Sequence, residues 1–385
     1  MVPKKKRPQS PVTRFIITAA LLVLVVMTGL GLSKYHAGGL RLGTFAGFQA
    51  RHLIYAAQDN GKLAVYDMDA GHRLVKTITL FTSSGADMRG VTAAAPTHRF
   101  YAMYNLNNAG HLVAVDLLTD RVLWDHVMHV PGIDRGNITP DGKTIYLPTW
   151  ENDDNTPYEV VVDALAGTEI GRIALPVKSH DTIVSLDGKF VLMETKSATA
   201  AMYVADTSTN QIVQTISGYC CGGVLAPFAI NGKHTLVVND VNDYAGFQLA
   251  SITTGRVLAS VPFVGEHGGS GHGIAWTPNE REVWVNDGGI SAVHVYDMTT
   301  QPPQQTHVVT TSHDGPHWLT FSIDGRYAYV AGRKGQGDVT DIVDTVTYAR
   351  VGSLVPSEDL LEVDLRGAIV TQVGNQFGIG RVTQP

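Results

Sequence analysis

The sequence predicts an all-β fold, a seven-bladed β-propeller, because two turn patterns recur along the 385-residue chain at nearly equal intervals. One pattern is a tight turn between two short apolar runs. The other is an apolar strand that ends in aspartate before a polar turn. No amphipathic helical period separates the strands, which excludes a parallel α/β fold. A unit of ~45 residues that contains four strands is typical of a propeller blade.

The tight turn is Asx-Gly in most of its copies, and this dipeptide between alternating apolar residues is the strongest short-range signal of a β-hairpin. Successive copies are 44, 46, 44, 48, 45 and 42 residues apart. The copies are Thr97-His98, Asp141-Gly142, Asp187-Gly188, Asn231-Gly232, Asn279-Glu280, Asp324-Gly325 and Arg366-Gly367.

The aspartate turn recurs in an independent register, with intervals of 49, 47, 43, 45, 46 and 47 residues. A β-sandwich does not repeat its turn chemistry in this way, so the pattern favours a propeller. The seven copies are at Asp67, Asp116, Asp163, Asp206, Ser251, Asp297 and Asp344.

The seven aspartate turns predict seven blades, whereas an eighth hairpin-like mark at Arg51 leaves an eight-bladed ring with an incomplete last blade as the alternative. A ring closes best when both chain ends share one sheet, because this removes an exposed edge. We therefore expect the strand near Leu360–Leu365 to pair into the blade that begins at His52.

The N-terminal segment predicts a membrane anchor. Residues 1–14 carry five positive charges and no acid, and the 18 residues Phe15–Leu32 carry no charge. As a helix, such a segment spans ~27 Å, close to the hydrocarbon thickness of a bilayer. The positive-inside rule keeps residues 1–14 in the cytoplasm. We expect a signal-anchor at 15–32, a linker at 33–39 and a propeller at 40–385 in the periplasm or extracellular space; a cleaved signal peptide is the alternative.

The composition limits the classes of partner. Hydrophobic residues make up 44% of the chain and charged residues 17%, values that fit neither a disordered nor a polytopic membrane protein. After residue 14 the chain carries 24 basic and 35 acidic side chains, a net charge of −11. Because an acidic body repels phosphate backbones, the sequence predicts no nucleic-acid partner.

Several stretches carry a family resemblance. FSIDGRYAYVAG (residues 321–332) resembles the YVTN repeat of YncE-like propeller proteins. Two further stretches, HGIAWTPNEREVWVND (residues 272–287) and VGNQFGIGRV (residues 373–382), resemble bacterial members of this group. The repeats cover about 340 residues. The resemblance implies an exported bacterial propeller of mostly undefined function. Lactonases, cytochrome d1-like and quinoprotein-like propellers and surface-layer proteins have similar repeats, so the resemblance specifies a fold and leaves activity open.

The loop that enters the innermost strand of each blade points at the central channel, where propellers usually bind ligands. These loops are unusually rich in charged and metal-binding side chains. From them we predict a ligand-binding site formed by Arg89, Arg135, His180, Asp181, His272 and His317.

Three interpretations of these residues remain open. His180, His272 and His317 could bind a transition metal or a haem, since neutral imidazole suits copper, zinc and iron. Arg89 and Arg135 could clamp a carboxylate or phosphate. Alternatively, all of these groups satisfy buried polar atoms in a wet channel. The sequence requires no cofactor.

The remaining motifs exclude some chemistry. No CxxCH motif is present, which excludes c-type haem attachment, and no serine-nucleophile or paired-carboxylate motif is present. The adjacent Cys220 and Cys221 could form a vicinal disulfide in an oxidising compartment, or they are simply small loop residues.

The sequence thus predicts a propeller that binds a small ligand or protein partner at its channel face. A metal- or haem-dependent oxidoreductase, a lactonase-like hydrolase and a structural surface protein are the alternatives.

Overall fold

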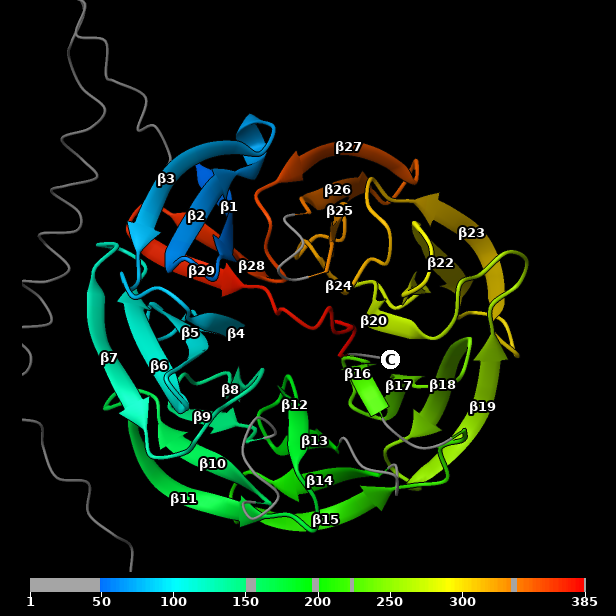
Figure 1. Ribbon diagram of the computed structural model, residues 1–385, viewed down its shortest axis with the longest axis horizontal. Helices are drawn as coiled ribbons and strands as arrows, with labels where there is room; N and C mark the ends of the chain where they lie inside the picture. Colours follow the sequence, from blue (N-terminus) through cyan, green and yellow to red (C-terminus); the bar gives the residue numbers. More distant parts are fainter. Residues whose placement is uncertain (1–48, 150–156, 196–200, 222–224, 334–337, 384–385) are drawn as a thin grey trace, which may run out of the picture. The chain divides into compact units, whose positions relative to one another are not determined.

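The computed structural model describes residues 49–149, 157–195, 201–221, 225–333 and 338–383. Its strands form seven antiparallel sheets around a central channel (Figure 1), which confirms the seven-bladed propeller. The predicted cytoplasmic tail, signal-anchor and linker (1–14, 15–32 and 33–39) lie outside the described residues. Within the described part of the chain, no helix combines the length and the hydropathy needed to cross a bilayer.

Six blades have four strands each, which follow one another from the channel outward. The innermost strands are β4 (Asp87–Ala94), β8 (Asn137–Ile138), β12 (Ser179–Val184), β16 (Leu225–Ile230), β20 (Gly271–Trp276) and β24 (Trp318–Phe321). The second strands are β5 (Arg99–Leu106), β9 (Thr144–Leu147), β13 (Phe190–Thr195), β17 (Leu236–Val241), β21 (Glu282–Asp287) and β25 (Tyr327–Ala331).

In the outer half of each blade the third strand is mostly buried, whereas the outermost strand is mostly exposed or half-buried. The third strands are β6 (Ala109–Asp116), β10 (Tyr158–Asp163), β14 (Met202–Asp206), β18 (Gly246–Ser251), β22 (Ala292–Asp297) and β26 (Thr340–Asp344). The outermost strands are β7 (Val122–Met128), β11 (Thr168–Ala174), β15 (Gln211–Ile216), β19 (Arg256–Pro262), β23 (Gln304–Thr310) and β27 (Ala349–Leu354).

The seventh blade is built from both ends of the ring and closes it. Its strands, from the channel outward, are β29 (Ile369–Val373), β28 (Asp359–Arg366), β1 (Ala50–Ala57), β2 (Lys62–Asp67) and β3 (Arg73–Thr79), with the short 3-10 helix η1 (Met68–Ala70) after β2. Strand β28 pairs with β1 from Ala50↔Arg366 to Ala57↔Asp359. The expected closure is thus confirmed. The last hairpin turn adds a fifth strand to this blade and does not start an eighth.

The repeated turns have the chemistry that the sequence predicted. At the tight turns the Oδ1 atoms of Asp141, Asp187 and Asp324 each accept a backbone N–H two residues later. The glycines that follow them have φ of 71 to 75°, a region that disfavours other residues. At the aspartate turns, Asp163 Oδ1 accepts the backbone N–H groups of Leu165 and Ala166.

One turn lies two residues later than predicted. In the blade of β16 and β17 the left-handed residue is His234, with φ 45°, and its N–H donates to the carbonyl of Asn231. The equivalent bond elsewhere runs from Gly142 to Thr139. The turn therefore lies at Lys233-His234, because Asn231 takes the position of Thr139 rather than that of Asp141.

Residues 374–383, which we call the tail, leave β29 and cross the central channel (Figure 1, red). Gln376 and Phe377 are 0% and 1% exposed. Gln376 Oε1 accepts the N–H of Val91 at 2.9 Å, and its Nε2 donates to the carbonyl of Gly136 at 3.2 Å. Further on, the Gly380 N–H donates to the carbonyl of Ile230. The tail thus lies across the channel and contacts the inner strands between its two mouths.

Candidate functional site

All six predicted site residues lie at one mouth of the channel, where the chain enters the inner strands; we call this the entry mouth. Arg89 lies near the start of β4, His180 and Asp181 near the start of β12, and His272 near the start of β20. Arg135 and His317 lie just before β8 and β24. Contacts through Asp134 and Glu358 join these residues, and we call the eight side chains together the entry network.

Arg89 enters the network through a buried ion pair. Its Nη2 lies 2.7 Å from Oδ2 of Asp134, which is 0% exposed, and its Nη1 lies 3.3 Å from Asp87 Oδ2. Burial alone would raise the pKa of the Asp134 carboxyl. The positive charges of Arg89, His180 and Arg135 outweigh this effect and hold the pKa well below its ordinary value. Asp134 is therefore a carboxylate at any physiological pH.

Arg135 is almost fully enclosed, at 3% exposed. Its Nη2 lies 2.7 Å from Glu358 Oε2 and its Nε lies 3.4 Å from Asp359 Oδ1. The guanidinium carbon lies 4.0 Å from the centre of the Trp318 ring, a cation–π contact. Burial would lower the pKa of Arg135, but the surrounding carboxylates raise it, so the charge is permanent.

His180 lies between two carboxylates. Its Nε2 is 3.4 Å from Asp134 Oδ2 and its Nδ1 is 3.0 Å from Asp181 Oδ2. Burial opposes the charged form of the imidazole, yet Asp181 and Asp134 raise the pKa of His180 to about 9. The ring is therefore a cation at neutral pH.

His272 and His317 form the far side of the network. Their rings stack at 3.7 Å between centroids with an interplanar angle of 12°. His317 Nδ1 lies 2.7 Å from Glu358 Oε1, and His272 Nδ1 lies 3.2 Å from the carbonyl oxygen of His317. Glu358 thus connects this histidine pair to Arg135.

The arrangement differs from an anion clamp, because both arginines are already ion-paired with carboxylates of the chain. Within the described residues around this mouth, acidic groups outnumber the cations Arg89, Arg135 and His180. The acidic groups are Asp87, Asp134, Asp181, Glu194, Glu358 and Asp359. The formal charge of the mouth is therefore negative, which favours a positively charged ligand.

One part of the network has the donor set of a metal site. One ligand atom each from Asp134, His180 and Asp181 lies within 4.8 Å of the other two, and all three residues are buried. Carboxylate and imidazole ligands together suit first-row transition metals. His272 and His317, which the sequence analysis grouped with His180 as metal ligands, lie outside this cluster.

Cys220 and Cys221 lie in the loop that enters β16 and are joined in a disulfide, with their Cα atoms 3.7 Å apart. The N–H of Cys220 donates to Gln248 Oε1 at 2.9 Å. Among the described residues there is no free cysteine. The sequence allowed this pairing but did not require it.

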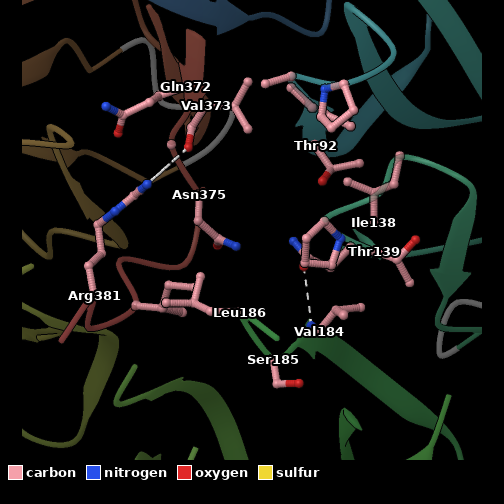
Figure 2. A pocket seen from close by; sticks show the side chains of 18 residues that line it. Thr92, Ile138, Thr139, Val184, Ser185, Leu186, Gln372, Val373, Asn375 and Arg381 are labelled. Carbon is pink, nitrogen blue, oxygen red and sulfur yellow. Dashed lines mark hydrogen bonds between the residues drawn. The ribbon is translucent and has the colours of Figure 1, made fainter. Parts of the chain in front are cut away.

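A pocket of about 210 Å³ lies at the opposite mouth, where the hairpin turns are; we call this the turn mouth (Figure 2). Its wall is formed by the ends of β4, β8 and β12 on one side and by the tail on the other. Its lining includes Thr92, Asn137, Val184, Leu186, Asn375, Ile379 and Arg381.

Two neighbouring carboxyls of β28, Glu362 and Asp364, lie behind Arg381. Burial raises the pKa of Glu362 to about 9, and the nearby Asp364 adds to this effect, although the backbone N–H of Ile323 opposes it. Glu362 is therefore neutral in the folded protein at pH 7, whereas it ionises in the unfolded chain near pH 4.5.

Because the folded state retains this proton, Glu362 reduces stability progressively as pH rises from about 4.5 to about 9. We expect Glu362→Gln to stabilise the protein relative to the native chain by an increment that grows by on the order of 1 kcal/mol per pH unit across this range. Urea unfolding at pH 5 and pH 8.5 measures the increment. The same substitution at the exposed Glu169 is the control, and an equal effect of Glu362→Gln at both pH values would contradict the assignment.

Comparisons with known proteins agree with the fold. Residues 264–334 match the family model "Lactonase, 7-bladed beta-propeller", a segment from just before β20 to just after β25. Among solved structures, hydrazine synthase of Kuenenia stuttgartiensis is similar, with a TM-score of 0.60 and 15% identity over 75% of this chain and 95% of that one. No curated protein matches.

The seven sheets define the chain as a seven-bladed β-propeller, and these matches agree with that fold. At 15% identity the structural likeness concerns the fold alone. The finer YVTN assignment rests on the repeat motifs of the sequence.

Proposed function

We propose that this protein is an exported, membrane-tethered β-propeller that binds a positively charged ligand, or a positively charged group of a protein partner, at the entry network. The basic residues 1–14 and the apolar segment 15–32 support the export and the tether. The observation that carries the binding role is the convergence of buried charges from separate blades on one mouth of the channel.

Burying those charges costs free energy. Removing a carboxylate, a guanidinium or an imidazolium from water costs several kcal/mol per ion, and ion pairing restores only part of this. A ring that serves only as a scaffold could fill the same positions with small or apolar side chains. Perturbed charges concentrated in a cleft are typical of functional sites.

The sign of the charge selects the ligand. An incoming anion would compete with Asp134 and Glu358 for the two arginines, whereas a cation would meet the acidic excess directly. Asp181 is the most suitable contact, since it is 0% exposed and its one ion pair in the described structure is with His180. A cation there would take the place of the imidazole proton.

The test is ligand-induced stabilisation. We expect at least one of Ca²⁺, Mn²⁺, Zn²⁺, Cu²⁺ and spermidine to raise the melting temperature of the native protein, since a ligand at 100 times its Kd contributes about 2.7 kcal/mol. Asp181→Asn should abolish the shift. Asp287→Asn is the control, because Asp287 is also 0% exposed but caps the Gly268 and Gly289 N–H groups. The absence of any shift, or an equal shift in both variants, would disprove this role.

A metal-dependent enzyme is the second candidate, and the cluster of Asp134, His180 and Asp181 favours it. In this case the cation is a resident transition metal. Elemental analysis of protein purified without a chelating tag distinguishes the two candidates. Stoichiometric copper, iron or zinc that is lost in Asp181→Asn supports an oxidoreductase, whereas metal-free protein that responds to added cations supports the binding role.

A further inference from the structure

The pocket at the turn mouth shares no lining residue with the entry network and lies at the other end of the inner strands. The same inner strands serve both mouths: β4 carries Arg89 near its start and Thr92 in the pocket, and β12 carries His180 near its start and Val184 in the pocket. Gln376 lies between them and bonds to Val91 and Gly136. A ligand in the pocket is therefore recognised by groups that the entry network does not use.

The described lining of this pocket contains one charged side chain, Arg381, and no carboxylate. Apolar walls come from side chains such as Leu186 and Ile379. The volume of about 210 Å³ corresponds to roughly seven water molecules at ~30 Å³ each, below the range for drug-sized ligands. The pocket thus suits a compact ligand.

Two of the three amide side chains of the lining, Asn375 and Asn137, are oriented as donors. Asn375 Oδ1 accepts the N–H of Phe377 at 2.8 Å, and Asn137 Oδ1 accepts the N–H of Val184 at 3.2 Å. Because each oxygen is occupied by a backbone donor, each Nδ2 group is left to face other partners. Figure 2 shows the Asn375 amide extending from the tail into the pocket.

Arg381 adds a cationic donor at the edge of the pocket (Figure 2). Its Nη1 and Nη2 donate to the carbonyl of Val373 at 3.4 and 3.5 Å, longer than the usual ~2.9 Å of an N–H···O bond. Five N–H groups of a guanidinium can donate, so these two long bonds leave capacity for a ligand. Of the two carboxyls behind it, Glu362 is neutral at pH 7, because burial raises its pKa to about 9, and burial also raises the pKa of Asp364.

We propose that the pocket at the turn mouth is a binding site for a small oxyanion, a carboxylate or a phosphate, which accepts hydrogen bonds from Asn375, Asn137 and Arg381. The amides supply directed donors, and the guanidinium supplies the charge. The inference is independent of the entry network, because its ligand has the opposite charge and its residues are different.

Isothermal titration at constant ionic strength tests the proposal with acetate, malonate, inorganic phosphate and glycerol as probes. We expect saturable binding of at least one anion and none of glycerol. Comparing the affinities for acetate and malonate with the affinity for phosphate distinguishes a carboxylate site from a phosphate site. Binding of no anion, or of glycerol as tightly as the anions, would overturn the proposal.

Asn375→Asp is the decisive variant, because it keeps the Oδ1 acceptor for Phe377 but replaces the Nδ2 donor with a negative oxygen. We expect it to weaken anion binding at least tenfold. Asn279→Asp is the matched control. Asn279 occupies the hairpin-turn position that Asp141 and Asp187 occupy in other blades, and its Oδ1 accepts the N–H of Arg281. Arg381→Gln provides a second variant should Asn375→Asp lower the melting temperature. Unchanged binding in both pocket variants contradicts the site.

Discussion

Removal of residues 359–385 is expected to abolish cooperative folding of the ring. Strand β28 lies between β29 and β1, and seven of its eight residues are buried. Its apolar residues Leu360, Leu361, Val363 and Leu365 contribute roughly 6–12 kcal/mol at 1.5–3 kcal/mol each. This is comparable to the whole stability of a typical domain, about 5–15 kcal/mol.

Circular dichroism and thermal melting measure the loss. Removing only residues 374–385 is the control; it deletes the tail and keeps the β28–β1 pairing, so a cooperative transition at a lower temperature is expected. A synthetic peptide of residues 359–383 should restore cooperative melting of the truncated chain by adding back the missing strand. A truncated protein that melts within a few degrees of the native one would show that ring closure is not required.

The second large effect is expected for Arg135→Met. The substitution preserves much of the side-chain volume but leaves Glu358 and Asp359, which are 5% and 2% exposed, without their buried cation. Breaking a buried ion pair in this way costs about 3–5 kcal/mol. Urea unfolding at pH 7 measures the loss, and the loss should shrink at low pH as the carboxyls take up protons.

Arg326→Met is the matched control. Arg326 Nη2 lies 2.6 Å from Asp344 Oδ2, but its side chain is 49% exposed, so its ion pair is worth about 0–1 kcal/mol. If both variants lose the same stability, burial does not govern the strength of the Arg135 ion pairs.

The blades could be predicted from the sequence because their signals are local. The backbone hydrogen bond that makes Asp187 a turn residue comes from a residue two positions away, so the same short residue pattern recurs at the equivalent turns. The turn at His234 was placed two residues too early for the same reason: Asn231-Gly232 has the local signature, but the left-handed residue is a histidine.

The candidate site was predictable in position but not in connectivity. The repeat register places Arg135 and His317 at the channel, yet the partner they share, Glu358, is 223 residues from Arg135 along the chain. No spacing rule connects such residues. The tail was not predicted at all, since its contacts come from five other blades and its own sequence has no strand period.

The strand shared between both ends of the ring has a consequence during protein synthesis. Residues that pair in β1 and β28 are about 300 positions apart. At a synthesis rate of ~5–20 residues per second, the edge of β1 therefore stays unpaired for roughly 15–60 s before β28 is made. During this interval β1 presents unpaired N–H and C=O groups that can recruit other strands. The nascent chain is therefore most vulnerable to aggregation at β1, and a chaperone that covers residues 50–57 would protect it until β28 emerges.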